Sequence, residues 1–500
     1  DFYNENDGLY VNGTVTNAVG EMTFTNEGDK GLNIYSNVKN TGTKTSIINK
    51  TGLLNIADSA LIENENDILI DNSGNKGLLI AGTVNNNGNS EIINADDGAL
   101  TISGKYNNGK NFTAKNDGQQ GLMISGVVKN QNGTVELTNT KTSLTIDGTV
   151  ENEQGNFKAV NSGHNGMRIN GTVNNKNGNS DYINENCILT VNGTATNAGG
   201  TMNFDNSGVA IKVNETGVIN SDGILTMTNS GPNGINIAGM MNVQNGTATI
   251  TNTGAKGITV TSTGRITDTT DKIAINNNAA GGITVQGLIN GVGVDINNSN
   301  SDVVIGDTTA NENYITSNGD ININIDNGNL YNSGVDKTLL KTTNNGKLNI
   351  NVTDGNIGEE VGNKAGISTG VDPNARDFTK SINVDIEGAI TAKALQKSKT
   401  EDLIVNIASR GKDLKVDHIK ADGKVILTAD FDKDGNSASI LNASTDNTKA
   451  NVEGKGISLI ASNSIGSSDK KLTFNQTEGK FNKEGLNIDE LSYAPTAKYG

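Results

Sequence analysis

Three aspartates near the end of the chain have the type and spacing closest to a chemical site. Asp430, Asp432 and Asp434 stand before Gly435 in "DFDKDGNSASIL", which is how a calcium-binding loop begins. The twelfth position of that loop is Leu441, where such a loop needs a bidentate Glu. We therefore interpret the segment as an acidic, solvated turn, with a weak calcium site as the alternative. No metal or cofactor site is predicted.

Catalytic groups are sparse in the rest of the sequence. Cleavage of polysaccharides needs clustered carboxylates, often beside Arg or Lys. The acidic residues of "ADDG", "ENEQG" and "NENDG" are scattered over turns instead, and Arg occurs at only four positions. His164 lies in a turn and His418 in a strand-like segment, with no Ser or Thr at a suggestive spacing, so we expect both on the surface. Cys187 is the single cysteine and cannot form an intramolecular disulfide. We predict that the protein is not an enzyme.

Charge and composition exclude several classes of partner. The net charge is −16 and the 39 basic residues are spread thinly, so no positive patch for nucleic acid or anionic lipid is expected. No run approaches the ~18 apolar residues of a membrane-spanning helix. The start of the sequence has neither an initiator Met nor a signal-peptide pattern, so we expect a mature product or a piece of a longer protein. Glycine is abundant, with 62 copies against 3 prolines, which favours turns built from Gly and Asn.

A short repeat organises the elements that would position any site. In "GLLIAGTVNN" (77–86), Leu78 and Ile80 alternate with other residues before Gly82, and "ALTISGKYNN" and "GLMISGVVKN" repeat the arrangement. Coils with this pattern start at positions 8, 31, 53, 77, 99, 121, 143, 166, 188, 210, 234, 257 and 282. A large aliphatic residue follows each start by one place and a β-branched residue by three, which is the period-2 pattern of a strand with one buried face.

Glycine and asparagine also recur at fixed places in the coil. Gly stands five places past most starts, where we expect a corner that needs a permissive φ. These glycines are Gly13, Gly82, Gly104, Gly126, Gly148, Gly171, Gly193, Gly239 and Gly287. One Asn column lies nine places past the start, at Asn17, Asn40, Asn86, Asn108, Asn130, Asn152, Asn175 and Asn197. A second lies eighteen places past it, at Asn26, Asn49, Asn139, Asn161, Asn184, Asn206 and Asn252.

Three short strands per coil of about 22 residues cannot bury their own faces, so neighbouring coils must stack. The predicted fold is an all-β, right-handed parallel β-helix, in which like residues stack and the Asn columns form hydrogen-bonded ladders. Residues 1–300 should form regular coils with a period of 22 to 25 residues. Residues 301–500 should continue the same solenoid with less regular, more charged coils and a small helix in "ITAKALQKSKTED".

The last hundred residues carry a family resemblance. "GKDLKVDHIKADGKVILTADFDKDGNSASI" followed by "GISLIASNSIGSSDKKLTFNQ" resembles the repeats of filamentous-haemagglutinin-type exoproteins, and most of all leukotoxin-type filamentous adhesins of Gram-negative-envelope bacteria. The stretch "ISLIASNSIGSS" is its most specific part. The resemblance implies a β-helical exoprotein that is secreted or held at the outer-membrane surface.

The function expected from fold and resemblance together is attachment. The chain would be a rigid β-helical stalk segment of an adhesin, whose partner is a receptor or glycan on a host or neighbouring cell, with lateral self-association as a further expectation. One alternative is a polysaccharide lyase or hydrolase, since such enzymes also use β-helices and would need Asp and Glu on adjacent coils. The other is a toxin-like exoprotein that acts on host cells.

Overall fold

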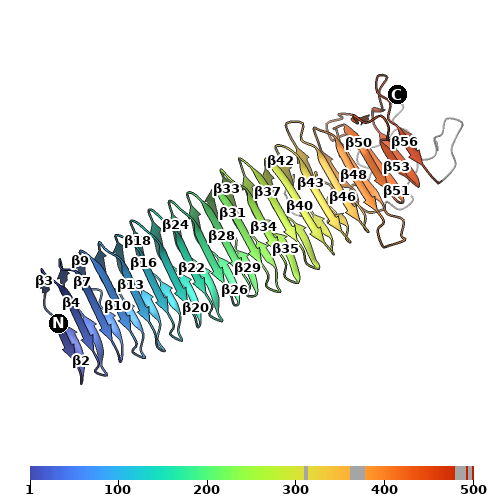
Figure 1. Ribbon diagram of the computed structural model, residues 1–500. Helices are drawn as coiled ribbons and strands as arrows, with labels where there is room; N and C mark the ends of the chain where they lie inside the picture. Colours follow the sequence, from blue (N-terminus) through green and yellow to red (C-terminus); the bar gives the residue numbers. More distant parts are fainter. Residues whose placement is uncertain (309–312, 361–377, 479–490, 494–497, 500) are drawn as a thin grey trace. The chain divides into compact units, whose positions relative to one another are not determined.

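The computed structural model describes residues 1–500 except 309–312, 361–377, 479–490, 494–497 and 500. Every regular element in the described part of the chain is a β-strand, and the strands pair in parallel. The chain forms two compact units, Asp1–Gly234 with Gly239–Gly246, and Ile235–Ala238 with Thr247–Gly500. Each unit is a parallel β-solenoid built from three sheets, and Figure 1 shows its strands stacked in ladders.

The first unit contains a set of strands for each of the three sheets. Sheet 1 is formed by β1 (Phe2–Asn4), β4 (Glu21–Asn26), β7 (Lys44–Asn49), β10 (Asp67–Asn72), β13 (Ser90–Asn94), β16 (Phe112–Asn116), β19 (Val135–Asn139), β22 (Phe157–Asn161), β25 (Ser180–Asn184), β28 (Thr201–Asn206) and β31 (Ile224–Asn229). Sheet 2 is formed by β2 (Gly8–Val11), β5 (Gly31–Ile34), β8 (Leu54–Ile56), β11 (Leu78–Ile80), β14 (Leu100–Ile102), β17 (Leu122–Ile124), β20 (Ser143–Ile146), β23 (Gly166–Ile169), β26 (Ile188–Val191) and β29 (Ala210–Val213). Sheet 3 is formed by β3 (Val15–Asn17), β6 (Val38–Asn40), β9 (Leu61–Asn64), β12 (Thr83–Asn86), β15 (Lys105–Asn108), β18 (Val127–Asn130), β21 (Thr149–Asn152), β24 (Thr172–Asn175), β27 (Thr194–Asn197), β30 (Val218–Asp222) and β33 (Met240–Gln244).

The second unit is built in the same way. Sheet 1 is formed by β34 (Ala248–Asn252), β37 (Lys272–Asn277), β40 (Gly293–Ser299), β43 (Ile321–Asp326), β46 (Leu348–Thr353), β48 (Ile390–Leu395), β50 (Leu414–Ala421), β52 (Ile440–Asn442), β53 (Val452–Gly454), β55 (Ser464–Ile465), β56 (Phe474–Gln476) and β58 (Lys498–Tyr499). Sheet 2 is formed by β32 (Ile235–Ile237), β35 (Lys256–Val260), β38 (Gly281–Val285), β41 (Val303–Ile305) and β44 (Leu330–Asn332). Sheet 3 is formed by β36 (Arg265–Asp268), β39 (Leu288–Gly291), β42 (Ile315–Ser317), β45 (Leu340–Thr342), β47 (Ile382–Asp385), β49 (Val405–Arg410), β51 (Lys424–Asp430), β54 (Gly456–Ala461) and β57 (Leu491–Tyr493).

The predicted aliphatic columns form the core. In sheet 2 of the first unit, Leu78 pairs with Leu100 and Ile80 with Ile102, and all four side chains are at most 1% exposed. Alternate residues point outward, because successive side chains of a strand face opposite sides of the sheet. The two columns predicted from the sequence are confirmed as interior, except at Leu9 in the first coil, which is half-buried.

Sheets 2 and 3 of the second unit converge towards the C-terminal end. Leu330 of β44 bridges to Ile357, which in turn bridges to Val405 of β49. β45 pairs with β47, and β47 pairs with β49. The single strand β49 therefore continues both sheet 2 and sheet 3. The coils that follow are built from two longer strands, such as the eight-residue β50 and the seven-residue β51. The division at residue 300 into regular and less regular coils stays a prediction.

The corner glycines have a different purpose from the one predicted. A positive φ occurs at glycines that begin coils, such as Gly77 and Gly121, and not at the corner glycines five places later. At the corner position Gly104, an added Cβ would lie 2.1 Å from the carbonyl oxygen of Gly82 in the coil before it. Glycine is therefore required at the corner by the close approach of stacked backbones.

The predicted helix in "ITAKALQKSKTED" is wrong. Ile390–Leu395 is strand β48, which pairs with β46 along its whole length. Its burial alternates, with Ile390, Ala392 and Ala394 inside, and the residues after Leu395 form a loop. Ala, Lys and Leu favour helix locally, but pairing with a neighbouring strand outweighs a propensity of less than about 1 kcal/mol per residue.

Candidate functional site

Both asparagine columns lie inside the solenoid as ladders. In sheet 3, each ladder Asn from Asn17 to Asn175 donates from Nδ2 to Oδ1 of the Asn in the next coil, with N···O distances of 2.6 to 3.2 Å, and Asn197 is the last acceptor. In sheet 1 of the first unit, each ladder Asn from Asn4 to Asn206 donates in the same way at 2.7 to 3.0 Å, up to Asn229. The predicted ladders are confirmed, and they include members that a fixed offset misses because coil lengths vary. These members are Asn64, Asn72, Asn94, Asn116, Asn229, Asn277 and Asn298.

Asn108 shows how completely a ladder amide is paired. Its Nδ2 donates to Oδ1 of Asn130 at 2.7 Å and to the carbonyl of Lys110 at 2.8 Å. Its Oδ1 accepts from Nδ2 of Asn86 at 3.0 Å and from Oγ of Ser90 at 2.6 Å. These contacts use both donors and both acceptor lone pairs of a carboxamide. The side chain is 1% exposed, so the column stabilises the stack and offers nothing to a ligand.

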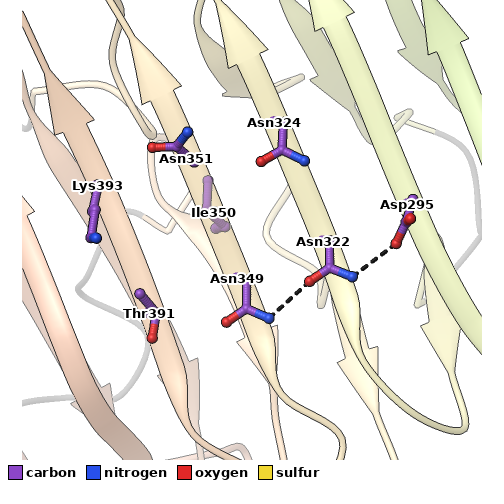
Figure 2. A pocket seen from close by; sticks show the side chains of 8 residues that line it. All are labelled: Asp295, Asn322, Asn324, Asn349, Ile350, Asn351, Thr391 and Lys393. Atoms are coloured by element: carbon purple, nitrogen blue, oxygen red, sulfur yellow. Dashed lines mark hydrogen bonds between the residues drawn. The ribbon is translucent and has the colours of Figure 1, made fainter. Parts of the chain in front are cut away.

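A polar hollow lies on the outer face of sheet 1 in the second unit. It has a volume of about 400 Å³ and is lined by Asp295, Asn322, Asn324, Asn349, Ile350, Asn351, Thr391 and Lys393. Figure 2 shows these side chains on four adjacent strands, β40, β43, β46 and β48. We call this surface, together with Asn297 of β40, the amide face.

The amide face consists of two rows that run across the strands. The first row is Asp295, Asn322, Asn349 and Thr391, and the second is Asn297, Asn324, Asn351 and Lys393. Outward positions alternate with buried aliphatic ones, as in "ININI" and "LNINV", so the core side chains hold the amides in register.

Hydrogen bonds link the amides along each row. Asn322 donates to Oδ1 of Asp295 at 2.8 Å, and Asn349 donates to Oδ1 of Asn322 at 2.8 Å, as the dashed lines of Figure 2 show. In the second row, Asn324 donates to Oδ1 of Asn297 at 2.9 Å. Unlike the inner ladders, these side chains are half-buried or exposed. The amide face is thus ordered and also open to a ligand.

The charges at the two ends of the face are few. The Asp295 carboxylate accepts from Nζ of Lys272, on the strand before the site, as well as from Asn322. Lys393 is the other charged residue that lines the hollow. Five of the eight lining residues are neutral amides or hydroxyls, so the surface suits a polar ligand without a large charge.

Asp354 fastens the loop beside the amide face. It follows β46 and receives hydrogen bonds from the backbone N–H groups of Lys397, Ser398 and Lys399 and from the hydroxyl of Ser398. The Ser398 hydroxyl, then the backbone donors, hold the pKa of the Asp354 carboxyl well below its usual range. This carboxylate ties the loop after β48 to the end of β46, and these two strands carry five of the eight lining residues.

The predicted aspartate turn closes on itself. Oδ1 of Asp432 accepts from the backbone N–H groups of Asp434 and Asn436, and its Oδ2 accepts from the Asn436 side chain. These donors, the Asn436 side chain first, lower the pKa of the Asp432 carboxyl. Asp430 is 2% exposed at the end of β51. No group of three metal-ligating side chains forms among the residues that the structure describes, and the solvated-turn interpretation stays a prediction.

The remaining sequence candidates lie apart from one another. His164 is exposed at a corner, as expected. His418 was expected on the surface but is largely buried, with its side chain 17% exposed and Nδ1 2.9 Å from the carbonyl oxygen of Ala450. Cys187 is half-buried and carries a positive φ of 62° at a corner. None of these three residues lines the amide face.

Sequence reasoning missed the amide face. The outward column of sheet 2 mixes residue types and gives no comparable array. The available signal was the alternation of Asn with Ile, Leu or Val in "ININI" and "LNINV", which places amides on one side of two consecutive strands of sheet 1.

Comparison of the chain with protein-family models, with curated proteins and with solved structures finds no match. Within the described residues, no helix is long and apolar enough to cross a membrane.

Proposed function

We propose that the chain is a non-enzymatic segment of a bacterial surface adhesin, secreted or held outside the cell, which attaches through its outer faces. The observation that carries this proposal is the division of amides between inside and outside. The inner ladders have buried, fully paired side chains such as Asn108, whereas Asn322, Asn324 and Asn349 are held in rows but reach solvent. A stacked solenoid can present such a surface on a stiff support.

The chemistry of the hollow supports binding over catalysis. Glycoside cleavage by the common route uses two carboxyl groups on either side of the bond. Asp295 is the single acid among the lining residues that the structure describes, and its oxygens already accept from Lys272 and Asn322. The tail that resembles filamentous adhesins supports an extracellular location.

Attachment by the purified chain tests this function directly. Beads that carry the full 500-residue chain should adhere to epithelial cells or to other bacteria, and beads that carry a heat-unfolded chain should not. If the beads adhere to none of the tested cell types, the proposal is contradicted. Release of new reducing ends from polysaccharides, or death of cells exposed to the soluble chain, would favour the enzyme or the toxin instead.

A further inference from the structure

The amides of the amide face keep unused hydrogen-bonding capacity. A carboxamide has two N–H donors and two acceptor lone pairs. Asn322 uses one donor on Asp295 and one acceptor on Asn349, which leaves one donor and one acceptor for a ligand. Because the side chain is half-buried, these groups reach solvent. The same pairing recurs in the second row between Asn324 and Asn297.

The rows are also prepared for binding before a ligand arrives. Each bonded amide is held in one orientation by its neighbour, so less side-chain freedom is lost when a ligand docks. Hydrogen bonds in a chain polarise one another, which strengthens the remaining donors and acceptors. Paired donors and acceptors repeat at the strand spacing of ~4.8 Å. A ligand with repeated hydroxyl groups can meet several coils at once.

The surroundings favour a neutral ligand that lies on the face. A polyanion needs several cations, but among the described residues that line the hollow Lys393 is the single basic one. A peptide that adds a strand needs a free sheet edge, whereas β43 is paired on both sides, with β40 and β46. Of the eight described residues that line the hollow, four are amides and none has an aromatic ring for stacking. Hydroxyl groups are the partners that such a surface can satisfy.

We propose that the amide face binds a neutral polysaccharide chain, whose hydroxyl groups bond to the two amide rows across β40, β43, β46 and β48. This inference rests on the proposed attachment function and names the ligand class at that site. With hydrogen bonds and no stacking, each contact is weak. Useful affinity then comes from many contacts along one polymer, which behaves as a multivalent ligand.

Binding of soluble polysaccharides to the full chain tests the inference. The neutral probes are dextran, mannan and laminarin, and the anionic probes are heparin and polygalacturonate, each followed by calorimetry or biolayer interferometry. We expect at least one neutral probe to bind and the anionic probes to bind more weakly. The variant Asn322→Ala/Asn324→Ala/Asn349→Ala/Asn351→Ala should weaken that binding at least tenfold and leave the circular dichroism spectrum unchanged.

Two further variants keep the test decisive. Asn203→Ala removes an outward amide of sheet 1 in the first unit, where it donates to Asp181 at 2.7 Å, and should leave binding unaltered. Asn351→Asp keeps the shape of an exposed side chain and should weaken binding even if the fourfold variant unfolds. Equal binding by Asn351→Asp and the unaltered chain, or no binding of any neutral probe, would overturn the inference.

The bead assay separates this inference from the proposed function. If beads with the fourfold variant attach to cells as well as beads with the unaltered chain, the attachment function stands and the amide face is not its site. If a neutral polysaccharide binds the amide face but beads attach to no cell, the ligand class stands and the adhesin function fails.

Discussion

At the scale of single residues, the decisive property of an asparagine here is the side of the strand it occupies. Asn107 and Asn108 are neighbours on β15, yet Asn107 faces outward and donates to Asn85 at 2.7 Å, while Asn108 belongs to the buried ladder. The first is half-exposed and can exchange its partner for water. The second cannot, because each partner it loses is left unpaired away from solvent.

Asn108→Ala should therefore destabilise the stack locally. Each buried donor or acceptor left unpaired costs on the order of 1 to 3 kcal/mol. We expect faster hydrogen exchange in β12, β15 and β18 and a lower melting temperature. Asn107→Ala, one position away on the same strand, is the matched control and should change little. Equal effects of the two substitutions would show that the inner column is not a stabilising ladder.

Asp354 should make the loop after β48 sensitive to acid. Its folded pKa lies below its ordinary value of 3.8, so the charged carboxylate stabilises the fold at pH values above 3.8. That stabilisation is lost as the pH falls through the lower, folded pKa. The Asp354→Asn variant should thus have a lower melting temperature than the unaltered chain at neutral pH. The difference between the two melting temperatures should shrink below pH 3.8. A difference that stays constant across this range would contradict a role for the charge.

Calcium should leave the Asp430 turn unaffected. A ligand raises the melting temperature only if it binds the folded state, and the oxygens of Asp432 already accept hydrogen bonds within the turn. The melting temperature measured by calorimetry should be the same with millimolar calcium as with a chelator. A calcium-dependent rise that disappears in Asp432→Ala would establish the alternative, a weak calcium site.

At the scale of the elements, each corner is shaped by the coil beneath it. The corner glycines Gly82, Gly104, Gly126 and Gly148 follow one another up the stack, and a Cβ added at each of the last three would lie within about 2.1 Å of the preceding carbonyl oxygen. No side-chain rearrangement relieves a contact with backbone. Gly therefore recurs at this corner because coils must approach closely to form their ladder bonds.

Gly104→Ala should separate the two coils on either side of it. The new methyl group must displace backbone, and overpacking of this kind costs about 1 to 3 kcal/mol. Gly13→Ala is the matched control, because a Cβ at Gly13 meets nothing within 4 Å. The melting temperature, followed by circular dichroism, should fall for Gly104→Ala and stay constant for Gly13→Ala. An unchanged melting temperature for Gly104→Ala would show that the space between the coils can accommodate a methyl group.

The period-2 pattern predicted most of the fold because one strong constraint repeats in every coil. Leu and Ile columns, turns and Asn ladders all follow from stacking like on like. The sequence did not predict the merging of two sheets at β49, because that change depends on Ile357 bridging strands from distant segments. It also missed the amide face, since Asn322 and Asn349 are 27 residues apart and meet only when their coils stack.

At the scale of the whole molecule, we infer that chemically identical side chains have different tasks. Buried amides hold coils together, and outward amides on β43 and β46 present hydrogen-bonding groups to a partner. The net charge of −16 keeps polyanions away, which agrees with a neutral ligand. Stability and attachment should therefore be separable by mutation.

The most direct measurement compares melting and attachment for two variants on the same beads and cells. We expect Asn108→Ala to melt at a lower temperature than the unaltered chain, yet to attach normally at 25 °C. We expect the fourfold variant at Asn322, Asn324, Asn349 and Asn351 to melt like the unaltered chain and to attach poorly. The opposite pattern, with attachment lost in Asn108→Ala and retained in the fourfold variant, would contradict the division between inner and outer amides.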